Sequence, residues 1–99
     1  MAGFAQQAIT LTPYYGSVGT TATSIVPARS DNGRNLVLIQ NTHASQSLGV
    51  TLDGTTPVIG ANALTLAAGA SLQLDKAVPQ GAIELIGSGA STTYMIYIG

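Results

Sequence analysis

The sequence contains no cysteine and no tryptophan, and only seven of its 99 residues are charged. Without cysteine, neither a disulfide framework nor a thiolate metal site can form, and the redox compartment is left open. The charged fraction of 7% lies far below the roughly 25% of an ordinary soluble domain. With a net charge of −1, the chain has no basic surface for nucleic acid or for anionic lipid. We therefore expect neither as a partner.

Ninety-nine residues can form one hydrophobic core but not two, so we expect a single domain. The first residues have no basic start and no apolar run, so we expect no signal peptide. No stretch approaches the roughly 18 apolar residues of a membrane helix, and we expect no membrane partner. Hydrophobic residues make up 45% of the chain, which excludes disorder. So few charges leave little repulsion between copies, and we expect a homo-oligomer, a homotrimer more than a dimer.

Two stretches near the middle of the chain indicate the kind of fold. Residues 36–39 (LVLI) are apolar at every position, which predicts a strand that is covered on both faces. In residues 47–53, Leu48, Val50 and Leu52 alternate with small or polar residues, which predicts a strand with one buried face. Asp53-Gly54 then turns the chain. This pair is typical of a sandwich core or of a sheet that a second subunit covers.

Short runs of the same kind recur along the chain, separated by glycine, proline, asparagine and aspartate. Strands are predicted around residues 8–12, 21–26, 36–39, 47–53, 63–67, 71–75, 82–86 and 92–98. Pro13 should end the first strand, and residues 14–20 should form a loop. No segment has apolar residues at helical spacing over three turns. The pattern predicts an all-β fold for residues 8–99, a jelly-roll-like antiparallel β-sandwich of about eight short strands, without giving the strand order.

The alternation also predicts which side chains form the core. The residues expected to be buried are Leu38 or Ile39, Val50, Leu52, Leu72, Leu74, Ile83 and Leu85. In the last predicted strand, Tyr94, Ile96 and Ile98 share one face. Tyr94 and Tyr97 could form a stacking or sugar-binding platform, but without tryptophan or a basic groove we expect them to serve packing.

The residue types that perform chemistry are scattered singly. His43 is the only histidine, and a metal site or a catalytic triad needs further ligands or partners, so we expect it to face solvent in a loop. Asp31, Asp53, Asp75 and Glu84 could form a glycosidase pair or a calcium cage, but turn chemistry and solubility account better for isolated carboxylates. We therefore predict no catalytic residue, no metal site and no cofactor, and a protein that is not an enzyme.

Residues 1–7 form an uncharged arm without alternation, ahead of the predicted domain. The arm carries Phe4, the only phenylalanine of the chain, together with Gln6 and Gln7. An exposed phenylalanine on such an arm is explained by a partner that buries it, or by Phe4 folding back over the edge of the domain's own sheet. We predict that Phe4, Gln6 and Gln7 bind a partner together with Tyr14 and Tyr15.

Four segments of the chain form a distinctive set of strand and turn motifs. They are RNLVLIQN at residues 34–41, VTLDGTTP at 50–57, LAAGASLQL at 66–74 and VPQGAI at 78–83. Taken together, they resemble capsid decoration (cement) proteins and related head accessory proteins of tailed bacteriophages. The resemblance covers about two-thirds of the chain. It implies a jelly-roll domain that assembles as dimers or trimers on the outside of an icosahedral shell.

The resemblance also implies a function and a location. The expected function is that of a non-enzymatic structural virion protein, made in the host cytoplasm, which binds the major capsid protein on the capsid exterior and stabilises the shell. No catalytic residue comes with this resemblance. Similar modules occur in tail and baseplate proteins, so a tail accessory or receptor-facing module is one alternative. A carbohydrate-binding jelly roll is the other.

Overall fold

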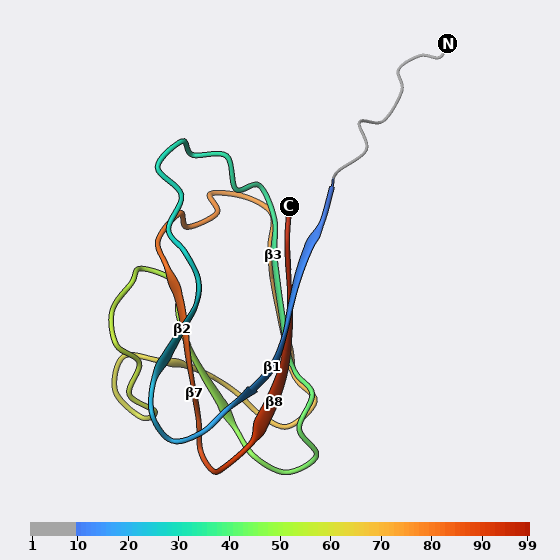
Figure 1. Ribbon diagram of the computed structural model, residues 1–99, viewed down its shortest axis with the longest axis vertical. Helices are drawn as coiled ribbons and strands as arrows, with labels where there is room; N and C mark the ends of the chain where they lie inside the picture. The colour runs from blue at the N-terminus through green and yellow to red at the C-terminus, as the bar shows by residue number, and fades with distance from the viewer. Residues whose placement is uncertain (1–9) are drawn as a thin grey trace.

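A computed structural model describes residues 10–99, which form eight strands and no helix (Figure 1). The strands are β1 (Thr12–Val18), β2 (Thr23–Val26), β3 (Val37–Asn41), β4 (Leu48–Thr51), β5 (Leu64–Leu66), β6 (Ser71–Leu74), β7 (Ile83–Gly87) and β8 (Thr92–Ile98). They form two antiparallel sheets of four strands that face each other. The all-β fold and the number of strands predicted from the alternation are confirmed.

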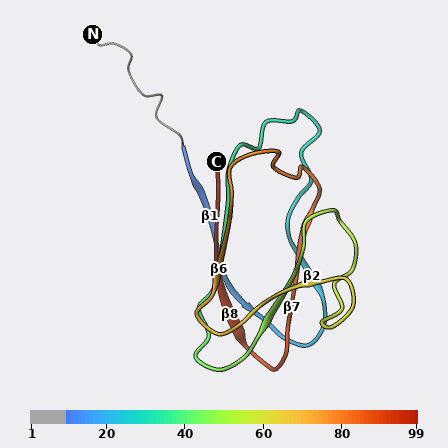
Figure 2. The ribbon, with the colours of Figure 1, turned by 180° about the vertical axis from the view of Figure 1, so that it is seen from behind.

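The strand order is that of a jelly roll. The first sheet runs β1-β8-β3-β6 and the second β2-β7-β4-β5. The pairs β4–β5, β3–β6, β2–β7 and β1–β8 are nested, as if one long hairpin had been folded over itself. Pairing of β3 with β8 and of β4 with β7 then joins the folded halves into two sheets. This connectivity corresponds to the two Greek keys of a jelly roll, and Figures 1 and 2 show the two layers from opposite sides.

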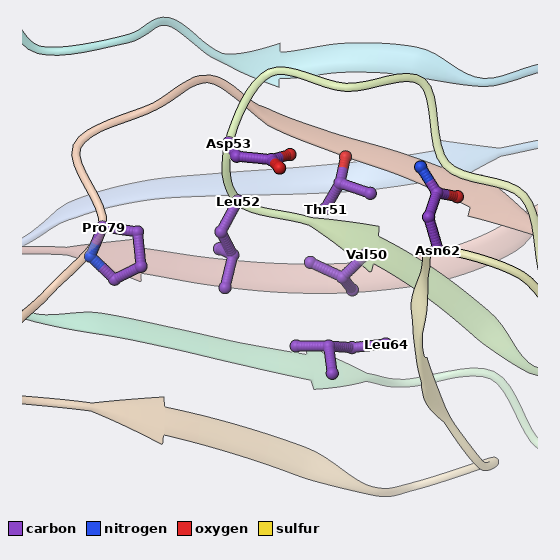
Figure 3. Close-up of a pocket in the computed structure, with 7 residues that line it drawn as sticks. All are labelled: Val50, Thr51, Leu52, Asp53, Asn62, Leu64 and Pro79. Carbon is purple, nitrogen blue, oxygen red and sulfur yellow. The ribbon is translucent and has the colours of Figure 1, made fainter.

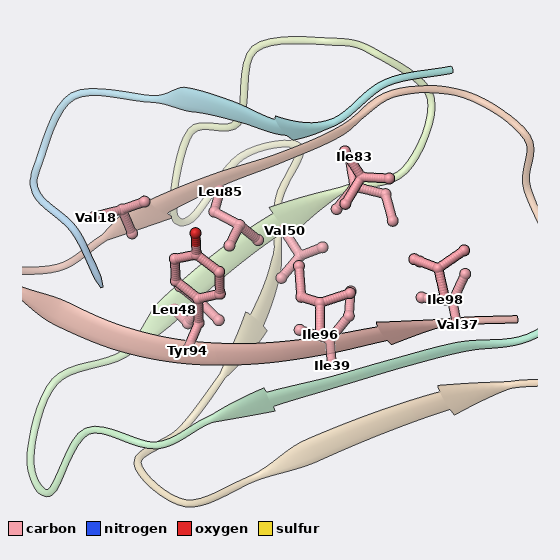
Figure 4. Packing of buried hydrophobic residues seen from close by; sticks show 11 residues of the cluster. Val18, Val37, Ile39, Leu48, Val50, Ile83, Leu85, Tyr94, Ile96 and Ile98 are labelled. Carbon is pink, nitrogen blue, oxygen red and sulfur yellow. The ribbon is translucent and has the colours of Figure 1, made fainter. Parts of the chain in front are cut away.

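The core fills the space between the two sheets (Figure 4). Its buried members are Val18, Val26, Val37, Ile39, Leu48, Val50, Ile83, Leu85, Tyr94, Ile96 and Ile98. Burial is thus confirmed for Ile39, Val50, Ile83 and Leu85, and for the shared face of the last strand. Three predicted core residues, Leu52, Leu72 and Leu74, are only half-buried. Leu52 follows the end of β4, and the other two lie on β6, an edge strand with a neighbour on one side only.

The first strand differs from its prediction. Residues 14–17 belong to β1 rather than to a loop, and Pro13 lies inside the strand instead of ending it. Proline has no N–H to donate, but β1 is an edge strand that pairs with β8 alone, so a missing donor on its open side disrupts no sheet hydrogen bond. Part of the predicted strand at residues 8–12 and the whole arm at residues 1–7 lie outside the described residues.

The burial of β4 also differs in part from its prediction. All four residues of Leu48–Thr51 are buried, including those on the face predicted to be polar and open. A Cβ atom placed on Gly49 would lie 2.9 Å from Ile59 Cγ1 and 3.2 Å from Ala63 Cβ, so the segment before β5 covers this outer face. The second sheet is therefore covered here on both sides by its own chain.

Candidate binding face on the first sheet

The first sheet presents a continuous outward surface built from four strands. Its outward positions form two rows across β1, β8, β3 and β6, which we call the outer face. One row is Pro13, Tyr97, Leu38 and Gln73, and the other is Tyr15, Met95, Gln40 and Ser71. Residues opposite one another in antiparallel strands project to the same side, so each row is a line of neighbouring side chains. The row between them points inward and contains Ile96 and Ile39, both fully buried.

No charged residue occurs in any of the four strands of the first sheet. The charged residues of the chain lie between β2 and β3, after β4, after β6 and in β7. Tyr15 is 76% exposed, although it is a large aromatic side chain. Protein interfaces are enriched in tyrosine and methionine and poor in charge at their centres. The composition of the outer face therefore suits a protein–protein contact better than it suits catalysis.

The outer face contains a hollow of about 230 Å³. It is lined by Leu38, Gln40, Ser71, Met95 and Tyr97, which come from β3, β6 and β8. Leu38, Met95 and Tyr97 are half-buried and form its apolar floor, whereas Gln40 and Ser71 are exposed and offer an amide and a hydroxyl. Across the sheet, Tyr15 lies next to Met95. The hollow has the chemistry of a receptor for an uncharged, apolar side chain.

A second hollow of about 240 Å³ lies beside the end of β4 (Figure 3). It is lined by Val50, Thr51, Leu52, Asp53, Asn62, Leu64 and Pro79, none of them aromatic. Its polar groups hold the chain segment that follows β4. Asp53 Oδ1 accepts hydrogen bonds from Thr55 N at 3.1 Å and from Thr55 Oγ1 at 2.6 Å, and Asn62 Oδ1 accepts from Val58 N at 2.8 Å. The hydrogen bonds to Thr55 lower the pKa of Asp53 below its ordinary value.

Asp53 and Asp31 both stabilise turns, as the sequence predicted for isolated carboxylates. Gly54 follows Asp53 with a φ of 83°, a conformation that favours glycine. Asp31 accepts from the exposed Arg29 side chain at 2.9 Å, and this hydrogen bond lowers its pKa. Among residues 10–99, no three histidine or carboxylate side chains lie close enough to hold a metal ion.

His43 differs from its prediction as a solvent-facing residue. The ring is half-buried, and its Nδ1 accepts hydrogen bonds from the backbone N–H groups of Ser45 and Gln46, both at 3.0 Å. Asn41, fully buried, binds the same loop through its amide, which donates to Gln46 O at 2.7 Å. His43 therefore shapes the loop between β3 and β4.

Arg34, the first residue of the RNLVLIQN segment, is a buried cation. Only 2% of the residue is exposed. Nη1 donates to Pro79 O at 2.9 Å and to Gly81 O at 2.8 Å, and Nη2 donates to Pro27 O at 2.9 Å. Its Nε has no partner within residues 10–99. Burial lowers the pKa of Arg34, yet the side chain ties together two connecting segments at one end of the sandwich.

The structure separates the residues that were predicted to bind a partner. Tyr15 lies on the outer face, whereas Tyr14 is half-buried and packs against the core, so packing accounts for it. Phe4, Gln6 and Gln7 lie outside the described residues. Tyr94 is buried, which excludes it from the platform considered with Tyr97, and burial raises its pKa.

Sequence reasoning did not select Leu38, Gln40, Ser71, Met95 or Tyr97 as a site. The sequence did indicate that they point outward, since each lies next to a predicted core position in its strand. What the pattern lacked was the order of the strands that places them side by side.

Comparison with known proteins gave no significant match, either to a family model or to a curated protein or solved structure. The residues described here contain no helix of the length and hydrophobicity that crossing a bilayer requires.

Proposed function

We propose that this protein is a non-enzymatic structural component of a phage virion. In this proposal it binds the outside of the capsid as an oligomer, contacts the major capsid protein there and stabilises the shell. The observation that supports it is the outer face, which exposes Tyr15 and lies on a sheet without a charged residue. The jelly-roll strand order and the four segments that resemble decoration proteins point in the same direction.

The argument from the outer face is physical. A free monomer gains nothing from exposing Tyr15 and leaving Met95 and Leu38 only half-buried on one uncharged sheet, and apolar surface of this kind marks interaction sites. The equivalent surface of β4 in the second sheet is covered by the chain itself. The difference between the sheets is explained if other subunits, of the shell or of the same protein, cover the first sheet in the assembly.

Binding of the purified protein to capsid shells that lack it tests the proposal. We expect co-sedimentation with intact shells and a raised temperature of shell disruption. Tyr15→Asp should abolish this binding, because it places a charge on a face that becomes dry. Thr65→Asp is the matched control, because Thr65 is exposed on the second sheet and should tolerate the charge. Failure of the wild-type protein to bind shells, or unimpaired binding by Tyr15→Asp, would refute the proposal.

Two alternatives give different results in the same experiments. Binding to tails or baseplates but not to shells would assign the protein to the tail. A carbohydrate ligand is also favoured by one observation, because the exposed Tyr15 and the half-buried Tyr97 lie on the same face as the exposed amide of Gln40. A glycan array in which binding is lost in Tyr15→Asp would support that alternative.

A further inference from the structure

We infer that the hollow on the outer face receives Phe4 from the N-terminal segment of a neighbouring copy of this chain. The inference concerns the isolated protein, so it does not rest on the proposed capsid function. It assigns to the hollow an occupant that the sequence itself supplies.

The chemistry of the hollow matches that occupant. Dry apolar cavities of about 150 Å³ can hold a benzene ring, and the hollow of about 230 Å³ is therefore large enough for a benzyl side chain. Met95 provides a thioether and Tyr97 a ring, which both make favourable contacts with an aromatic partner. Gln40 and Ser71 can hydrogen-bond the backbone on either side of the inserted ring. Phe4 is the only phenylalanine of the chain.

The N-terminal segment and the outer face both lack charged side chains, which supports the insertion of Phe4 into the hollow. Residues 2–9 (AGFAQQAI) contain no charged side chain, and neither does any strand of the first sheet. An uncharged segment enters an uncharged hollow without leaving a buried charge unpaired, whereas a basic or acidic peptide would lose its solvation with no compensating partner. An apolar, uncharged segment is therefore the occupant that the surface favours.

The direction of the chain favours a neighbouring copy over the same one. The N-terminal end of β1 leads away from the sandwich in both views (Figures 1 and 2), and residues 10 and 11, which precede this strand, are exposed. Residues 5–12 contain no glycine, proline, asparagine or aspartate, the residues that favour a tight turn back onto the same face. The eight residue steps from Phe4 to Thr12 can span about 26 Å when extended, which is enough to reach an adjacent copy.

Such a contact is heterologous, because the segment of one copy meets a different surface on the next. Heterologous contacts close into rings when the rotation between copies allows it, and a trimer is one such ring. Tyr15 lies on β1, at the edge of the sheet away from β6, and is not one of the residues that line the hollow.

Disulfide trapping tests the inference, because the chain has no cysteine of its own. One copy keeps Phe4 and carries Ala5→Cys beside it together with a size tag, and a second copy carries Ser71→Cys at the rim of the hollow. Mixed and mildly oxidised, they should form a disulfide-linked pair of both sizes. Ala5→Cys mixed with Thr65→Cys is the control, since Thr65 is also exposed but lies on the second sheet. Disulfides form only where Cα atoms come within about 7 Å.

Two outcomes would overturn the inference. One is a yield of the mixed disulfide no higher than in the Thr65→Cys control. The other is an intramolecular disulfide in the double variant Ala5→Cys/Ser71→Cys that forms in place of the intermolecular one, because it would place the segment on its own outer face.

Self-association measured by analytical ultracentrifugation gives an independent readout. Phe4→Ala should weaken the association at least tenfold without changing the melting temperature, and Phe4→Leu should restore part of it. Unchanged association in Phe4→Ala would also overturn the inference. Because shell binding is measured separately with Tyr15→Asp, failure of one proposal can be told from failure of the other.

Discussion

Arg34 offers the sharpest test of how this fold is held together. Its guanidinium is buried and donates to the carbonyl oxygens of Pro27, Pro79 and Gly81, and within residues 10–99 it forms no ion pair with a carboxylate. Gln80 supports the same site, because its side chain accepts from Arg34 N at 3.0 Å and donates to Arg34 O at 2.8 Å. Replacing Arg34 by methionine keeps the apolar stem and removes the three donors.

The expected size of the effect follows from two opposing contributions. Each hydrogen bond from a charged donor contributes about 1.5–3 kcal/mol, and its loss leaves a buried carbonyl without a partner. Removing the guanidinium also relieves the free-energy penalty of burying a charge, which is several kcal/mol. We expect Arg34→Met to lower the free energy of unfolding by about 3 kcal/mol. For a domain of this length, that corresponds to a fall in melting temperature of about 12–24 °C.

Urea denaturation and thermal unfolding measure this effect directly. Arg34→Lys should recover only part of the loss, because one ammonium group cannot span carbonyls that two guanidinium nitrogens reach. Arg29→Met is the matched control: it removes the same charge from an exposed pair with Asp31 and should leave the melting temperature close to that of the wild type. If Arg34→Met were within about 1 kcal/mol of the wild type, the three hydrogen bonds would not stabilise the fold as we argue.

Three further predictions concern the core and the loops. Burial raises the pKa of Tyr94 above 10.0, so the folded state favours the neutral phenol, and stability should fall as the pH rises through the alkaline range. Tyr94→Phe should reduce this fall, which urea denaturation at several pH values above about pH 9 measures. Gly49→Ala should cost about 1–3 kcal/mol by overpacking, because its Cβ would lie 2.8 Å from Ile86 Cγ2, whereas Gly19→Ala, with open space around it, should be neutral in the same denaturation assay. His43→Ala should cost about 1 kcal/mol in urea denaturation through the loss of two backbone hydrogen bonds, and a loss below about 0.3 kcal/mol would contradict that role.

Features that depend on neighbouring residues could be predicted from the sequence. Alternation in residues 82–86 and 92–98 gives the inward faces of β7 and β8, because side chains alternate along any extended strand. Asp53-Gly54 indicates a turn for an equally local reason. The Asp53 side chain accepts a hydrogen bond from Thr55 N, two residues away, and Gly54 adopts the positive φ of the turn. Pro13 was misleading, because whether a proline ends a strand depends on whether the strand lies at a sheet edge.

The candidate binding face was predictable only in part. Tyr15 was among the residues predicted to bind a partner. Leu38, Gln40, Ser71 and Met95 are brought together only by the strand order β1-β8-β3-β6. Arg34 was missed for a related reason. Two of its three hydrogen bonds go to Pro79 and Gly81, which are distant in sequence, and no local pattern distinguishes a buried arginine from an exposed one.

Local patterns are enough to predict the all-β class, the number of strands, most of their positions and the inward faces of the late strands. Which strands share a sheet, which outer face the chain covers and the burial of Arg34 become known only from the folded arrangement. Periodicity and turn chemistry act over a few residues, whereas strand order depends on pairing between distant parts of the chain. β1 and β8, from opposite ends of the chain, lie side by side, and their pairing brings Tyr15 next to Met95.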